Sequence, residues 1–246
     1  MLHYFKKKKK SSPFFPENYI DIHSHIIPGI DDGAKSVEES IALLQKMNEL
    51  GIQNFVCTPH VMESVWENSS QKISSQFSEL EQHLKNSNLK HLSVRFAAEY
   101  MLDQNFQQLL ENKDILPIKD NYILVEMSYL NPPINLYEML FDIQIAGYQP
   151  ILAHPERYKF LHSTFNEYQK LKDAGCLFQL NLLSLSSYYG KEVNKIAIEL
   201  LKKNMIDVAS SDAHHQKHLA TLEEITKNSK LHKLVQHVLE NNKLFI

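Results

Sequence analysis

Two histidines at the end of an apolar run could bind a metal ion. In the stretch YIDIHSHIIPGIDDG, residues 19–33, His23 and His25 stand two apart, and Asp31 and Asp32 follow them. The preceding alternation of apolar residues is typical of a strand that runs into a loop, and residues i and i+2 of a strand point to the same face. Both imidazoles would then leave the strand end together. Imidazole is the commonest metal ligand in proteins, although two ordinary polar residues at a strand end would show the same pattern.

Further carboxylates and imidazoles stand at the ends of later apolar runs. A glutamate inside the run ILVEM, for example, is costly to bury unless it is paired or binds a metal. Nine such groups are too many for one ion and suit two or three ions with bridging carboxylates. Because no cysteine is among them, they favour Mn, Fe, Zn or Mg. The candidate ligands are His23, His25, Asp32, His60, Glu99, Glu126, His154, Asp212 and His214.

The elements that must position these groups alternate along the chain. Amphipathic segments separate short β-rich runs, and repeated alternation predicts a parallel sheet. No glycine-rich dinucleotide fingerprint follows the first strand. We therefore predict an α/β fold with a single irregular (β/α)7 barrel, a distorted TIM-like barrel whose chemistry sits at the carboxyl ends of its strands. The expected strands lie near 19–25, 52–57, 93–99, 122–127, 149–154, 176–182 and 205–210, and the expected helices at 36–51, 69–86, 135–147, 163–175, 190–204, 220–226 and 229–241.

Composition limits the classes of protein that are possible. A chain of 246 residues with 43% hydrophobic and 22% charged residues suits one globular domain, which we place at 17–246. The net charge of −3 argues against broad nucleic-acid binding. Residues 1–16 are expected to be a disordered leader, and its run Lys6–Lys10 could at most attract an anionic membrane surface. No signal peptide or membrane span is evident, which favours the cytoplasm.

The two cysteines do not fit a cysteine-based phosphatase. Cys57 and Cys176 both lie in apolar runs, where buried, reduced thiols are the usual finding. A cysteine-based phosphatase needs an arginine six residues after the nucleophile, but Glu63 and Leu182 occupy those positions. The cysteine-based mechanism is therefore excluded on sequence.

Taken in order, the motifs DIHSH…DDG, TPH, AEY, VEMS, AHPERY and SDAH resemble the polymerase-and-histidinol-phosphatase (PHP) superfamily. Within it, the chain resembles the bacterial tyrosine-protein phosphatases associated with capsule and exopolysaccharide synthesis, over roughly residues 19–225. The resemblance implies a PHP-type barrel with a trinuclear metal centre, most simply manganese, that hydrolyses phosphotyrosine on the tail of a bacterial tyrosine kinase. The family's ligands fall on the nine residues named above, with Asp32 rather than Asp31 as the ligand.

The resemblance also implies catalytic roles. Arg157 in AHPERY falls on a phosphate-binding arginine, and it is one of only two arginines in the chain. His60 or His214 could donate a proton to the leaving group, and Asp212 is counted among the catalytic residues. Many members carry a second arginine after the last ligand pair, where this chain reads HQKHLA. Lys217 or His218 would have to replace it, or the contact is missing.

Three alternatives to the tyrosine phosphatase remain at this stage. A small-molecule phosphatase of the same superfamily could act on a substrate such as histidinol phosphate. An exonuclease-like phosphodiesterase is disfavoured by the acidic charge balance and by the lack of an aromatic and basic stripe. A non-catalytic, metal-stabilised regulatory protein is disfavoured by the intact ligand set.

Trp66 in VMESVW and Tyr129 in SYLNPP could form walls for the phenyl ring of a phosphotyrosine substrate.

Overall fold

A computed structural model describes residues 13–246 and shows an α/β fold built on parallel strands. One sheet has the order β1-β2-β4 and the other the order β3-β5-β6-β7-β8-β9, and every strand pair in both is parallel. The strands are β1 (Ile20–Asp21), β2 (Asn54–Cys57), β3 (His60–Val61), β4 (Ser93–Phe96), β5 (Glu99–Met101), β6 (Tyr122–Glu126), β7 (Gln149–Ala153), β8 (Leu177–Asn181) and β9 (Val208–Ser210).

Backbone hydrogen bonds connect the segments that follow the first and the last strand. Ser24 and Ala213 form a parallel bridge, and the N–H of Asp212 donates to the carbonyl of His23 at 2.8 Å. The second predicted strand, 52–57, is observed as β2, and a separate strand, β3, begins only after Pro59, which has no N–H to donate to a ladder. The third predicted strand is divided into β4 and β5.

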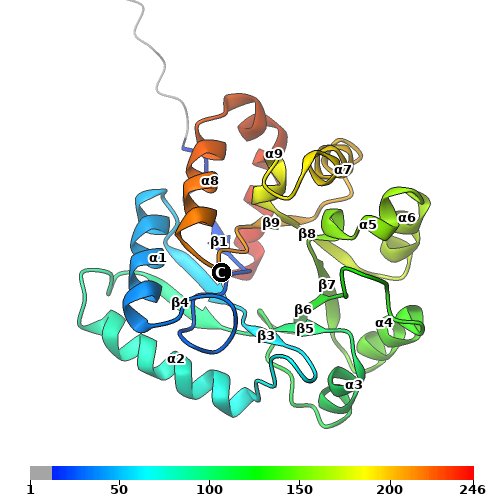
Figure 1. The fold of residues 1–246 in the computed structure, drawn as a ribbon, viewed down its shortest axis with the longest axis horizontal. Helices are drawn as coiled ribbons and strands as arrows, with labels where there is room; N and C mark the ends of the chain where they lie inside the picture. The colour runs from blue at the N-terminus through cyan, green and yellow to red at the C-terminus, as the bar shows by residue number, and fades with distance from the viewer. Residues whose placement is uncertain (1–12) are drawn as a thin grey trace, which may run out of the picture.

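Helices surround the strands, which lie at the centre of Figure 1. The sequence prediction missed α3, which is short and buries only Phe106 and Leu110. It also began α8 four residues late, because the side chain of His215 caps this helix by accepting from the N–H of His218. The helices are α1 (Val37–Glu49), α2 (Ser70–Lys85), α3 (Gln104–Glu111), α4 (Leu136–Ile145), α5 (Lys159–His162), α6 (Asn166–Asp173), α7 (Lys191–Lys202), α8 (Gln216–Thr226) and α9 (Ser229–Asn241), with the 3-10 helices η1 (Pro155–Arg157), η2 (Leu182–Leu185) and η3 (Asn242–Phe245).

A small apolar cluster inside the ring of strands positions the polar residues above it. It includes Leu124 of β6 and Val208 of β9, with Leu177 of β8 packed against it. Phe245 belongs to the same cluster, and the C-terminus is marked at the centre of the ring in Figure 1. In β6, Glu126 follows Leu124 by two residues and so faces the same side. The apolar cluster therefore fills the amino end of the strands and leaves their carboxyl ends to polar groups.

The predicted leader extends too far into the chain. Phe14 and Phe15 are buried, and their rings contact His232 and Tyr19 at centroid distances of 5.2 and 4.7 Å. These two residues pack with the folded domain, so the expected boundary at residue 16 was wrong for them. Lys6–Lys10 lie outside the described residues. Within residues 13–246, none of the helices has both the length and the apolar composition for crossing a bilayer.

Candidate metal centre

The nine predicted ligands meet at one end of the strands. Their ligand atoms form four overlapping groups, and within each group all atoms lie within 4.8 Å of one another. Every group joins side chains from different strand ends, which is why residues far apart in the sequence converge. The groups are His25, Asp32, His60 and His214; His23, His154 and Asp212; His23, His25 and Glu99; and His60, Glu99 and Glu126.

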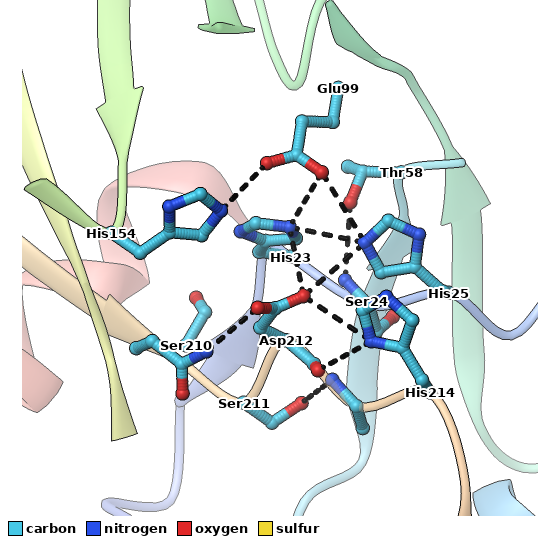
Figure 2. Close-up of polar contacts among 12 residues, drawn as sticks. His23, Ser24, His25, Thr58, Glu99, His154, Ser210, Ser211, Asp212 and His214 are labelled. Atoms are coloured by element: carbon cyan, nitrogen blue, oxygen red, sulfur yellow. Dashed lines mark hydrogen bonds and ion pairs between the residues drawn. The ribbon is translucent and has the colours of Figure 1, made fainter. Parts of the chain in front are cut away.

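Two carboxylates lie between several imidazoles, as bridging ligands do. Figure 2 shows the imidazoles of His23 and His25 between Glu99 on one side and Asp212 on the other. Glu99 Oε2 lies 3.2 Å from His23 Nε2 and 3.1 Å from His60 Nδ1. Asp212 Oδ1 lies 3.3 Å from the Nε2 atoms of both His23 and His25. Glu99 and Asp212 would therefore each help to hold more than one ion.

Several buried nitrogen and oxygen atoms that can bind a metal ion have no hydrogen-bond partner, which supports a metal site. His60 Nδ1, Glu99 Oε2 and Glu126 Oε1 are buried, yet none has a hydrogen bond to any residue of the described chain. His60 Nδ1 and Glu126 Oε1 lie only 2.8 Å apart, but the angles between them do not allow a hydrogen bond. Both atoms therefore point toward the same small space. Buried polar atoms normally have partners. With nitrogen and oxygen donors and no sulfur, the set fits borderline or hard divalent ions.

The electrostatics of the cluster favour an ionised carboxylate at Glu99 and a neutral imidazole at His154. Burial opposes ionisation of Glu99, but His23 and His60 more than offset it and hold the pKa of Glu99 well below its usual value. Burial, together with the charge of Arg157, lowers the pKa of His154 to about 4. His154 therefore presents an uncharged ring at neutral pH, which is the form that binds metal.

Two further residues orient the central histidines. Asp31 Oδ2 accepts from His25 Nδ1 at 2.8 Å, and Gln179 Oε1 accepts from His23 Nδ1 at 2.8 Å. A proton held on Nδ1 leaves the Nε2 lone pair free, and in both rings Nε2 is the atom that faces the carboxylates. Asp31 thus stands behind a candidate ligand, whereas Asp32 lies among the ligands, with Oδ1 3.4 Å from His214 Nε2.

Strand β8 was the one predicted strand to which no site residue was assigned. In the structure it supplies Gln179 and also Asn181, whose Nδ2 donates to Asp212 Oδ2 at 2.7 Å. The signal was present in the run FQLNL, because two amides two residues apart in a strand face the same side. Both side chains are fully buried, so this polar face serves the site rather than solvent.

The backbone is unusual where the ligands leave the strands. His154 and Asp212 both have positive φ, 36° and 50°, a region that residues other than glycine rarely adopt. Such strain persists where surrounding structure requires it and is common at functional sites. Gly33 follows Asp32 for a steric reason, since a Cβ there would lie 2.0 Å from the carbonyl oxygen of His25.

Arg157 lies between two tyrosines at the edge of the centre. Its Nη1 donates to Asp212 Oδ2 at 2.9 Å, and its guanidinium carbon lies 4.7 Å from the ring centroid of Tyr129 and 4.1 Å from that of Tyr189. Planar guanidinium groups stack on aromatic rings in this way. The sequence prediction missed Tyr189, because the loop before α7 brings it to Arg157 through the tertiary fold alone.

A cavity of about 780 Å³ opens onto the metal centre. Trp66, Tyr129 and Arg157 line it, as does His218, whereas Lys217 lines a different hollow. Neither cysteine contributes to the cavity wall, and burial raises the pKa of the Cys57 thiol to about 12. The other arginine, Arg95, donates to the backbone carbonyl of Phe245 at the opposite end of the strands.

Known proteins with the same organisation match over most of the chain. The family model described as "Capsular polysaccharide synthesis, CpsB/CapC" matches residues 19–242. The chain is 32% identical to the tyrosine-protein phosphatase CpsB of Streptococcus pneumoniae over 202 residues, which are 80% of this chain and 83% of CpsB. It is 30% identical to the tyrosine-protein phosphatase YwqE of Bacillus subtilis over 199 residues, which are 80% and 78% of the two chains.

A solved structure gives the same result at the level of the fold. The crystal structures of YwqE from Bacillus subtilis and CpsB from Streptococcus pneumoniae are described as unique metal-dependent tyrosine phosphatases. A chain from that work matches with a TM-score of 0.76 and 27% identity, covering 90% of this chain and 94% of its own length. The likeness therefore extends over nearly the whole described chain.

Proposed function

The chain belongs to the CpsB/CapC family of capsular polysaccharide synthesis proteins, and on this basis we propose that it is a metal-dependent protein-tyrosine phosphatase. The observation that carries the proposal is a cavity that ends in nine converging nitrogen and oxygen ligands with an arginine at their edge. Relatives at 30% and 32% identity are named tyrosine-protein phosphatases. A non-catalytic role would not require this complete set of ligands beside an open cavity.

The nine side chains would hold two or three divalent ions, for which we propose manganese, with iron, zinc or magnesium as other ions of suitable chemistry. When bound, such ions would polarise the attacking water and neutralise charge on the phosphoryl oxygens. Glu99 and Asp212 would each help to hold more than one ion, because each lies close to two imidazoles. Asp31 and Gln179 would keep His25 and His23 in the tautomer that presents Nε2.

Arg157 would bind the phosphate of the substrate. Its guanidinium lies over the rings of Tyr129 and Tyr189, and only Nη1 has a hydrogen bond to a described residue. The remaining N–H groups form a fork that matches two phosphate oxygens. His60 and His214 border the same cavity and are our candidates for protonating the leaving oxygen.

We assign the second phosphate contact to His218 rather than to Lys217. His218 lines the cavity, and its Nδ1 accepts a hydrogen bond from the backbone N–H of His214 at 3.2 Å. A neutral ring that accepts at Nδ1 carries its proton on Nε2. That N–H can then donate to a phosphoryl oxygen, so the missing second arginine would be replaced by a neutral donor.

The proposed substrate is phosphotyrosine on a flexible tail of a bacterial tyrosine kinase that regulates capsule or exopolysaccharide synthesis. Trp66 and Tyr129 in the cavity wall would contact the phenyl ring.

Three sequence predictions about the chain as a whole remain predictions. They are the cytoplasmic location, the count of seven strand–helix units in the barrel, and the assignment of residues 17–246 as the catalytic domain.

Two matched peptides that differ only in phosphotyrosine or phosphoserine test the proposal, with histidinol phosphate alongside. We expect kcat/KM to be highest for phosphotyrosine, because it reaches further into the cavity and phenolate, with a pKa near 10, leaves more readily than an alkoxide. Equal rates on both peptides, or a faster rate on histidinol phosphate, would show that the chain is instead a small-molecule phosphatase.

A further inference from the structure

A second hollow, of about 310 Å³, lies beside the catalytic cavity. The two spaces share three residues, Tyr129, Arg157 and Tyr189. The stacked guanidinium and its two rings therefore form a wall common to both. Lys159 and Val193 complete the second hollow and do not line the first. We call this second space the Lys159 hollow.

The charged side chains of the Lys159 hollow are both cations. Lys159, the first residue of α5, is exposed, and its ammonium forms no ion pair with any residue of the described range 13–246. The acidic partner of Arg157 is Asp212, which lines the catalytic cavity and not this hollow. The hollow is therefore positive, although the chain as a whole carries a net charge of −3.

The nearest acidic side chain in the sequence does not neutralise these cations. Glu156 is fully buried, and its Oε1 accepts from the N–H of Asn181 at 3.0 Å and from the hydroxyl of Ser184 at 2.7 Å. It therefore faces the interior. Tyr129 and Tyr189 contribute aromatic surface to the hollow, and an anion beside such surface is attracted more strongly by the cations than it would be in bulk water.

A phosphotyrosine bound in the catalytic cavity remains attached to a polypeptide that must leave through the cavity mouth. A side chain near it in sequence can then reach the adjoining hollow. We propose that the Lys159 hollow is a subsite for an anionic side chain close to the scissile phosphotyrosine, either a carboxylate or a second phosphotyrosine. This inference rests on the proposed function and adds to it a preference for acidic sequence around the target.

The test uses sets of phosphotyrosine peptides, one set for each position within three residues of the target, and the peptides of a set differ only at that position. The variable residue is Asp, a second phosphotyrosine, Asn or Lys, so the arms separate a carboxylate from a phosphate. The protein variants are Lys159→Gln and Lys159→Glu, with Lys233→Gln as the matched control because Lys233 is exposed on α9. p-Nitrophenyl phosphate, which has no flanking residues, serves as the reference substrate.

The full chain should prefer an anionic neighbour at one or more positions by about two- to fivefold in KM, the range of an exposed ion pair. Lys159→Gln should abolish that preference, and Lys159→Glu should reverse it in favour of the Lys peptide. Neither change should alter the rate on p-nitrophenyl phosphate, since Lys159 has no role in the catalytic cavity. Lys233→Gln should behave as the unmodified protein.

The same peptides carrying a non-hydrolysable phosphonate in place of the phosphate give dissociation constants by calorimetry. These constants should follow the same order, and they test the subsite even if no hydrolysis occurs. If the unmodified protein hydrolyses none of the peptides but binds the phosphonate peptides in the expected order, the proposed phosphatase activity is refuted and the subsite is supported. Normal hydrolysis with the same peptide order in the unmodified protein and Lys159→Glu would refute the subsite alone.

Discussion

Replacing Asp31 by asparagine should weaken metal binding without removing a ligand. Asp31 is buried, and its two oxygens accept three hydrogen bonds, from His25 Nδ1 at 2.8 Å, from the N–H of His60 at 3.2 Å and from the N–H of Gly33 at 2.9 Å. An asparagine amide offers only one acceptor atom. Either Gly33 or the pair of His25 and His60 would then face an NH₂ group instead of an oxygen.

The size of the effect follows from these contacts. A buried donor that loses its acceptor costs about 1–3 kcal/mol, which for a domain of this size corresponds to a Tm lower by about 2–12 °C. If the amide nitrogen faces His25, the proton of that ring is favoured on Nε2, the atom that would otherwise bind metal. Loss of such an orienting carboxylate typically weakens metal binding about 10–100-fold.

The assay measures the dissociation constant for Mn²⁺ by competition with a fluorescent chelator, and the Tm of the metal-free protein. Asp173→Asn, at an exposed carboxylate that ends α6, is the control and should change neither. Activity of Asp31→Asn should be low at limiting Mn²⁺ and largely recover at saturation. A folded Asp31→Asn protein with unchanged Mn²⁺ affinity would refute the view that Asp31 orients His25.

Three further predictions follow from the site and its surroundings. Arg157→Lys should lower kcat/KM on a phosphotyrosine peptide about 10–100-fold, nearly as much as Arg157→Ala, because one charge-assisted bond of the fork is lost; full activity in the lysine variant would mean that only charge matters. Chelation should abolish hydrolysis and Mn²⁺ restore it, while Cys57→Ser stays active; a folded but inactive Cys57→Ser protein would contradict the metal mechanism. Burial raises the pKa of Glu156 to about 7, above the value of about 4.3 expected in the unfolded chain, so stability that is present below pH 4 is lost as the pH rises to 7. In urea unfolding, the free energy of unfolding of Glu156→Gln should therefore fall by roughly 3 kcal/mol less between pH 4 and pH 7 than that of the unmodified protein. An unchanged pH dependence would count against the buried, protonated state of Glu156.

The sequence alone identified the candidate ligands because of a general property of parallel strands. Their carboxyl ends meet at one edge, so residues such as His23, Glu126 and Asp212 are brought together once the alternation of strands and helices is known. Because alternate residues of a strand point to the same face of the sheet, the sequence also predicted which side chains share a face. The break between β2 and β3 was readable in principle as well, since Pro59 interrupts the run CTPH.

Only the tertiary structure decided which residues support the ligands. The carboxylate of Asp31 turns toward His25 and not into the cluster, and without the family resemblance no local pattern distinguishes it from Asp32. Tyr189 stacks on Arg157 because the path of the loop before α7 brings it there, and the φ angles of His154 and Asp212 depend on the surrounding contacts. Strand ends are specified by short-range periodicity, whereas the direction of a side chain and its partners depend on packing between segments distant in sequence.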